Sequence, residues 1–586
     1  MSNPYFNLIR TVWSYGKPWR YSIIGYYLAF MAAQTFLSIS PYAFGQAINE
    51  LQNFREGRLN QIILWLLAGV VVVLLFWLFH GPARIVERTV ALRILQSFRL
   101  KLYEQLTHLP LKWHQNHHSG NVLTRINRSA NELYRFAENQ FKYIQAIVRF
   151  ITSIGFLLWI SLPVGFISLF TSFLVIAVVV FFDKKLIPLY NAENDIENHV
   201  GSVLFDYINN MTTVLTLRLG DLTHSNLFQR MLSVWPFFKK EVFLNEAKWF
   251  SMMILFSITQ VAILIGYTIY ILNTMGSISL GIIVMIFRYQ WELNEIFQDI
   301  SVNYGELVRM DTDIKNIQPI LDDIQRFAHR PIGATIAQRW HVIEIKKLSF
   351  SHVDKENYNS IFNQAAFKIK HGEKVALIGS SGGGKSTLMN LLSGLYTPSN
   401  VEISIDGVDF NSLEPLQAIT TLIPQDPEIF ENTIEFNITM DLQINHEEIE
   451  KVVKISGFSE VLNSLPDRLQ TDIREKGLNL SVGQKQRLAL ARGLFAARFS
   501  SLVLMDEPTS SVDLLTERAI LSDIMKEYSN AAMIISLHRL HLLPSFDSII
   551  MLRQGKVIAN GPVTELLYKP GPVRDLWQTY QRDPDS

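Results

Sequence analysis

A glycine-rich stretch lies between an apolar run and a predicted helix, and it reads Gly-Ser-Ser-Gly-Gly-Gly-Lys-Ser-Thr from residue 379 to residue 387. A phosphate chain is bound by backbone N–H groups, a helix N-terminus, a positive charge and a hydroxyl that holds Mg²⁺. Glycines let the backbone approach the phosphates, Lys385 can reach the β and γ phosphates, and Ser386 can hold the metal. The predicted nucleotide-binding loop comprises Gly379, Ser380, Ser381, Gly382, Gly383, Gly384, Lys385, Ser386 and Thr387.

Two adjacent carboxylates end a second apolar run, which extends from Ser501 to Glu507. Beside a phosphate-binding loop, Asp506 can hold Mg²⁺ and Glu507 can polarise the attacking water as a general base. A purely structural pairing of the two acids is the alternative, and the phosphate loop upstream makes it the weaker one. The two motifs together predict an ATP-hydrolysing site.

The elements that position these residues belong to the second of two compositionally different parts of the chain. With 586 residues the chain is too long for one core, and its character changes at about residue 300. The first part carries apolar runs of membrane-spanning length, whereas the remainder is typical of a soluble α/β protein. A formal net charge of zero favours neither nucleic acid nor an acidic surface as a partner. The absence of cysteine excludes disulfides and thiolate metal sites.

Six apolar segments of the first part have the length of membrane-spanning helices. Arg and Lys are concentrated between the second and third segments, so the positive-inside rule places that stretch and the N-terminus in the cytoplasm. Helical periodicity in the two long polar stretches predicts that the flanking spans extend into water. The predicted spans are 21–42, 62–79, 144–162, 164–182, 249–272 and 280–300.

The sixth predicted span carries polar and charged side chains within an otherwise apolar segment. Arg288 and Glu292 are four residues apart and therefore share one face of a helix. Because exposing such groups to lipid is costly, we expect them to face a water-filled cavity or to pair inside the helix bundle. Arg288, Gln290 and Glu292 are therefore candidates for substrate contact, and the fastening of two helices is an equally weighted alternative.

The stretch Leu-Ser-Val-Gly-Gln at 480–484 makes the resemblance to one family specific. The chain resembles a half-transporter of the ATP-binding cassette (ABC) superfamily, in the exporter group with multidrug-resistance and lipid-flippase types. The family usually has glycine where this chain has Val482. The resemblance implies an α-helical six-span transmembrane domain followed by an α/β P-loop ATPase domain. We expect the membrane domain at 1–316, a linker at 317–340 and the nucleotide-binding domain at 341–586.

The resemblance also implies roles for residues outside the two chemical motifs. Gln425 matches the loop residue that senses Mg²⁺ and the attacking water, and His538 matches the switch histidine that contacts the γ-phosphate. His352 stands where the family usually has a tyrosine that stacks on adenine, and an imidazole can stack with less area. The remaining implied nucleotide contacts are Ser481, Gly483 and Gln484 of the signature motif and Asp513 of the segment that crosses the dimer interface.

A second chain is implied because the glycine loop alone leaves one side of the γ-phosphate bare. In the family, Ser481 and Gly483 of a second copy close that side, so that two chains dimerise head to tail and trap two ATP molecules. A homodimer is the simpler expectation because Lys385 and Glu507 are both present, and a related half-transporter is the alternative partner.

The function implied by the resemblance is ATP-driven export or flipping of an amphipathic or lipid-like compound by alternating access, with ATP and Mg²⁺ as cofactors. The expected location is a bacterial cytoplasmic membrane, spanned several times, with the ATPase domain in the cytoplasm. An importer of a metal chelate on the same fold, and an ATP-gated channel or regulatory ATP binder, are the alternatives.

Overall fold

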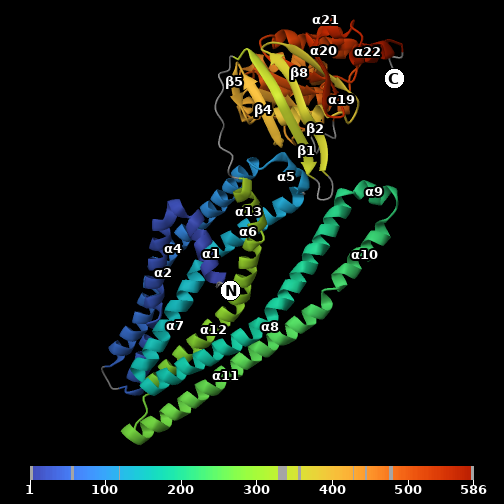
Figure 1. Ribbon diagram of the computed structural model, residues 1–586. Helices are drawn as coiled ribbons and strands as arrows, with labels where there is room; N and C mark the ends of the chain where they lie inside the picture. The colour runs from blue at the N-terminus through green and yellow to red at the C-terminus, as the bar shows by residue number, and fades with distance from the viewer. Residues whose placement is uncertain are drawn as a thin grey trace. The chain divides into compact units, whose positions relative to one another are not determined.

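The structure is a computed structural model that describes residues 4–582 except 55–57, 118, 328–339, 354–357, 427, 443–444 and 474–479. The chain forms two compact units (Figure 1), one comprising Met1–His108 with His117–Arg326 and the other Leu109–Asn116 with Phe327–Ser586. In its described residues the first unit is helical, whereas the second contains two β-sheets and the helices that cover them. The predicted order of a helical domain followed by an α/β domain is confirmed.

The helical unit is built around four very long helices, α4 (Leu59–Thr107), α8 (Leu162–Asn209), α11 (Trp235–Met275) and α12 (Leu280–Lys315). Each is much longer than the roughly 20 residues that cross a bilayer, so the predicted polar extension of the second span continues that span as one helix. The polar helix before the third span is separated from it at Asn139. The shorter helices are α1 (Pro4–Tyr15), α2 (Arg20–Leu37), α3 (Ser40–Gln52), α6 (Ser119–Glu138), α7 (Gln140–Ile160), α9 (Met211–Thr216), α10 (Gly220–Leu232) and α13 (Gln318–Phe327).

Five helical segments of the described chain are long and apolar enough to cross a membrane. The sixth predicted span, 280–300, lies in α12 and is not among them, since Arg288, Glu292 and Glu295 interrupt its apolar sequence. That span therefore stays a prediction. The five segments are Lys17–Gln52, Leu59–Thr107, Ser119–Ile160, Leu162–Asn209 and Gly220–Thr274.

The N-terminal end of α12 is capped by side chains from α3. Its first N–H groups need partners from outside the helix. The backbone N of Leu280 donates to Oε1 of Gln52 at 2.8 Å, and that of Gly281 donates to Oδ1 of Asn49 at 2.9 Å. A Cβ at Gly281 would lie 2.1 Å from the backbone O of Gly45, so a glycine is required for this close crossing of helices. Residues more than 200 positions apart thus anchor the start of α12.

Two boundaries differ from the predicted ones. The expected linker 317–340 begins as a helix, because α13 occupies Gln318–Phe327 and buries Ile320 and Ile324, while residues 328–339 lie outside the described chain. The short helix α5 (Leu111–Asn116) was expected in the membrane domain, yet its residues belong to the second compact unit.

The larger sheet of the second unit has the strand order β10-β9-β3-β8-β7-β6. All neighbouring strands are parallel except β10 and β9. Its strands are β3 (Lys374–Gly379), β6 (Thr420–Ile423), β7 (Leu502–Asp506), β8 (Ala532–Ser536), β9 (Ser548–Arg553) and β10 (Lys556–Pro562). The smaller, antiparallel sheet is formed by β1 (Val342–Val353), β2 (Tyr358–Lys370), β4 (Asn400–Ile405) and β5 (Val408–Phe410).

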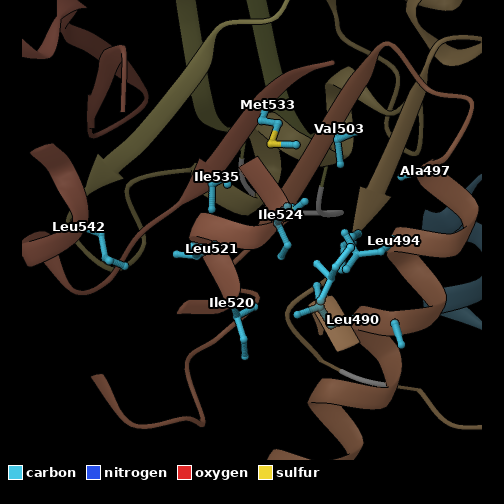
Figure 2. Close-up of a cluster of buried hydrophobic side chains, with 14 of the residues drawn as sticks. Leu490, Leu494, Ala497, Val503, Ile520, Leu521, Ile524, Met533, Ile535 and Leu542 are labelled. Atoms are coloured by element: carbon cyan, nitrogen blue, oxygen red, sulfur yellow. The ribbon is translucent and has the colours of Figure 1, made fainter. Parts of the chain in front are cut away.

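The larger sheet is buried on both faces, because successive side chains of a strand point to opposite sides. Leu502 and Leu504 of β7 enter a core shared with the smaller sheet and α14 (Lys385–Leu392). Val503 enters the other core, under α19 (Val482–Ala497) and α20 (Leu514–Glu527). Figure 2 shows this second core. The unit's remaining helices are α15 (Glu414–Gln417), α16 (Ile434–Thr439), α17 (His446–Ile455), α18 (Ser459–Ser464), α21 (Val563–Leu566) and α22 (Pro572–Arg582).

Candidate active site

The predicted site residues gather where four parallel strands end. In the strand order β3-β8-β7-β6 the carboxyl ends lie at one edge of the sheet. Gly379 ends β3, Asp506 ends β7, and Gln425 and His538 follow β6 and β8 by two residues. Ligands of open α/β sheets bind at this edge. The tertiary structure thus brings four separate motifs of the sequence together.

The glycine loop joins β3 to α14 in the predicted manner. Gly384 precedes the helix with a φ of +100° and provides no side-chain cap, so the first N–H groups of α14 are open to a ligand. A Cβ on Gly379 would lie 2.2 Å from the backbone O of Leu552, which explains this glycine. Lys385 is buried, and its Nζ donates to the backbone O of Gly379 at 2.9 Å. Loop, helix and ammonium are therefore arranged in a way that suits an anion, and their contact with phosphate stays a prediction.

The two carboxylates at the end of β7 have different environments. Asp506 is buried, and its Oδ1 accepts a hydrogen bond from Oγ of Ser536 at 2.6 Å. Glu507 is half-buried, and its Oε2 accepts a hydrogen bond from Nε2 of Gln425 at 2.9 Å. Glu507 thus faces the loop that follows β6, whereas Asp506 is fixed within the sheet edge. This division suits one carboxylate for binding a cation and the other for accepting a proton.

The residues present fit Mg²⁺ by their donor chemistry. The predicted ligands are the hydroxyl of Ser386, the carboxylate of Asp506 and the side-chain amide of Gln425, and oxygen ligands are what this ion prefers. Ser386 is exposed in the first turn of α14. Because Nε2 of Gln425 is bonded to Glu507, its Oε1 is the atom suited to a cation.

The signature residues lie at the N-terminus of α19. Oγ of Ser481 accepts from the backbone N of Gln484 at 3.3 Å, and Oε1 of Gln484 accepts from the backbone N of Ser481 at 2.8 Å. This reciprocal capping box defines the start of the helix. Gly483 packs near Ser511, since a Cβ there would lie 3.1 Å from the Ser511 backbone O. Among the described residues these contacts join the motif to Ser511.

Asp513 begins α20 as its N-cap. Its Oδ1 accepts a hydrogen bond from the backbone N of Thr516 at 3.0 Å. This bond holds the pKa of the Asp513 carboxyl below its usual value. The described role of Asp513 is therefore structural, and its contact with nucleotide stays a prediction.

The two predicted histidines differ in how far the structure describes them. His538 is exposed in the loop after β8. The next residue, Arg539, donates through Nη1 to the backbone O of Val512 at 2.9 Å and to Oε2 of Glu517 at 3.1 Å. His352 lies in β1 opposite Asn359, and its side chain is outside the described part of the structure.

Two residues that hold the site were missed by sequence reasoning. Ser536 bonds both Asp506 and the backbone N of Glu507, and Gln486 bonds the backbone O of Glu507. The signal for Gln486 is its spacing, because it precedes Leu490 by four residues and Leu494 by eight and so shares the apolar face of α19. A buried amide at such a position requires hydrogen-bond partners.

The three substrate-contact candidates do not share one environment. Gln290 is buried, and its Nε2 donates to Oγ of Ser168 in α8. Oε2 of Glu292 accepts from Oγ of Ser153 in α7 at 2.9 Å, whereas Arg288 is exposed. These contacts favour the fastening of helices for Gln290 and Glu292 and leave Arg288 as the accessible group.

Comparison with known proteins finds two matching family descriptions. Residues 23–290 match the ABC transporter transmembrane region, and residues 362–510 match the ABC transporter family. The chain is 24% identical to the multidrug resistance-like ATP-binding protein MdlB of Buchnera aphidicola, over 98% of each chain. It is 26% identical to ATP-binding cassette sub-family B member 6 of Xenopus tropicalis over 84% of this chain, but spans only 58% of that relative.

A solved structure has the same overall fold. It is described as a bacterial Atm1-family ABC exporter with ATP bound, and it aligns with a TM-score of 0.78 over 97% of this chain and 99% of that one. The sequence identity is 20%, so this likeness concerns the fold.

Proposed function

Because the chain belongs to the ABC transporter family and joins its membrane region to its ATPase domain in one polypeptide, we propose that two copies form an ATP-driven exporter or flippase. The observation that carries this proposal is the bond between Gln425 and Glu507 at the strand edge that holds the glycine loop. This bond supports Glu507 as a general base that a loop residue holds near the glycine loop.

In the proposed ATPase step, different residues bind the phosphates and accept the proton. Lys385 and the open N–H groups of α14 bind the β and γ phosphates. Glu507 orients the attacking water and accepts its proton, with Gln425 holding its carboxylate in place. Mg²⁺, held by Ser386, Asp506 and Gln425, would neutralise negative charge on the phosphates. We assign His538, exposed after β8, to the γ-phosphate.

A second copy completes this site in the proposal. Within one chain, Ser481 contacts Gln484 and Gly483 lies near Ser511. We propose that the opposite side of these two residues contacts the second chain. A head-to-tail homodimer brings that surface to the other chain's γ-phosphate. The catalytic residues of both sites are then complete, and a related half-transporter remains the alternative partner.

Coupling to transport requires that closure of the ATPase dimer change the arrangement of the membrane helices. ATP favours the closed dimer, and the closed dimer favours an outward-open arrangement of the spans. The chain passes from the ATPase unit to the helical unit between Asn116 and His117, which supports the segment 114–121 as one proposed covalent connection. The segment 206–216, at the end of α8 and in α9, is the second proposed connection.

An amphipathic or lipid-like compound is the proposed substrate, in an integral membrane protein of a bacterial cytoplasmic membrane. The description of MdlB as multidrug resistance-like supports this class. The exposed Arg288 of α12 is the proposed contact for a polar group of the substrate.

The test is Mg·ATP hydrolysis by the purified chain in lipid nanodiscs, with lipids, drugs and metal chelates added in turn. We expect basal turnover, loss of turnover in Glu507→Gln, and stimulation by one compound class, which an amphipathic exporter should show and a regulatory ATP binder should not. An inactive parent chain under all conditions would contradict the homodimeric transporter.

A further inference from the structure

Glu507 has a strained backbone, which is uncommon for a residue with a side chain. Its φ is +46°, in the left-handed region that non-glycine residues rarely adopt. Such a conformation is unfavourable and persists only where neighbouring groups hold it. Neighbouring groups must therefore hold the backbone of the proposed base.

Two buried side chains from different elements bind the backbone of Glu507, one at its N–H and one at its carbonyl oxygen. The backbone N of Glu507 donates to Oγ of Ser536, at the end of β8, at 2.8 Å. The backbone O of Glu507 accepts from Nε2 of Gln486, in α19, at 3.1 Å. Ser536 and Gln486 are 1% and 6% exposed, so water competes little for either bond.

Gln486 also orders the segment that follows Glu507. Its Nε2 donates to Oγ of Ser510 at 3.0 Å, and its Oε1 accepts from the backbone N of Ser511 at 2.9 Å. One amide therefore satisfies three groups of a single loop, and its own donor and acceptor atoms are both used. The backbone of α19 is in turn fixed by Leu490 and Leu494, which enter the core shown in Figure 2.

We infer that Gln486 is a positioning residue for ATP hydrolysis, which sets the direction of the Glu507 carboxylate by holding its left-handed peptide from α19. A rotation of that peptide would turn the side chain away from Gln425, and a base that is displaced by about 1 Å loses much of its effect. The same helix starts with Ser481 and Gly483, so the signature motif and the base of one chain are joined through Gln486. This inference rests on the proposed ATPase function.

The test compares substitutions that remove different bonds of Gln486. Gln486→Met keeps length and helix propensity but removes all three bonds. Gln486→Glu keeps an acceptor for Ser511 and loses the donor to Glu507. If the bond to Glu507 matters, both variants lower kcat by about ten-fold or more while KM for ATP changes less than about three-fold.

The matched control is Tyr528→Phe. The hydroxyl of Tyr528 donates to the backbone O of Leu494 at 2.7 Å, so this variant removes a bond to the same helix far along from its first turn. We expect a measurable loss of thermal stability, because one hydrogen bond to α19 is removed, and a parental kcat. An equal loss of kcat in Tyr528→Phe and Gln486→Met would show a general effect of α19 and overturn the positioning role.

A second measurement asks whether Gln486 acts through Glu507. In the Glu507→Gln background, Gln486→Met should not lower the residual turnover further, because the base it positions is already gone. A further ten-fold loss would overturn the inference. A parental kcat in Gln486→Met would overturn the inference about Gln486 but not the proposed function. Absence of turnover in the parent chain would overturn both.

Discussion

Gln425 and Glu507 lie 82 residues apart in the sequence, and their side chains meet at 2.9 Å, Nε2 to Oε2. They follow the neighbouring parallel strands β6 and β7, whose register pairs Ile423 with Met505. This pairing places the loop after β6 against the proposed base. A conformational change of that loop would therefore move a direct hydrogen-bond partner of the Glu507 carboxylate.

Replacement of Glu507 by Gln removes the proposed base and keeps the shape of its side chain. We expect turnover to fall by about 100-fold or more, since general-base catalysis contributes a factor of this order. ATP binding should persist, because the glycine loop and Lys385 are unchanged. Single-turnover hydrolysis and binding of a fluorescent ATP analogue measure the two effects. Turnover near the parental level would remove Glu507 from this role.

Replacement of Lys385 by Ala acts on binding and not on the proton transfer. Loss of the buried ammonium at the glycine loop should weaken ATP affinity by about ten-fold or more, which corresponds to about 1.4 kcal/mol. The control is Lys368→Ala, because Lys368 is largely exposed and pairs with Glu344 at 3.0 Å on the surface. Equal affinities in the two variants would contradict the assigned role of Lys385.

The cap on α12 predicts a stability effect in the helical unit. Asn49→Ala removes the acceptor for the Gly281 N–H, and we expect a loss of about 1–2 kcal/mol in the free energy of unfolding. Asn53→Ala is the control, since the Asn53 side chain bonds only the backbone O of Asn49 one turn earlier among its described contacts. Thermal unfolding in detergent should show a lower Tm for Asn49→Ala. Equal Tm values would mean that the cap is unimportant.

Asp406 predicts a pH-dependent contribution to stability. Backbone hydrogen bonds from Val342 and His341 hold the pKa of the Asp406 carboxyl below its usual value. Because the folded state favours the ionised form, the contribution is present above the unfolded-state pKa of about 4 and is lost as the pH falls through the lower folded-state pKa. Asp406→Asn tolerates the positive φ of this position and removes the charge.

The measurement for Asp406 is the difference in Tm between parent and Asp406→Asn across pH. The difference should be present at pH 7 and should shrink as the pH falls below about 4. A difference that is independent of pH would assign the effect to the amide and not to the charge.

Motifs that act within a few residues were predictable from the sequence alone. The glycine loop and the carboxylates of Asp506 and Glu507 follow from local spacing, because a strand, a turn and a helix are encoded by neighbouring residues. The division into a helical membrane region and an α/β domain follows from long apolar runs in one part of the chain. The segment 318–327 was interpreted as a linker because its polar sequence hid the buried Ile320 and Ile324 of an amphipathic helix.

The tertiary structure decided which distant residues hold these motifs. Gln486 contacts Glu507 because α19 packs on the sheet, and Ser536 contacts it because β8 lies beside β7. Local sequence does not encode either of these neighbour relations. The capping of α12 by Asn49 likewise depends on the crossing of α3 and α12. Hydrogen bonds between distant residues are set by strand order and helix packing, whereas local sequence encodes only the elements themselves.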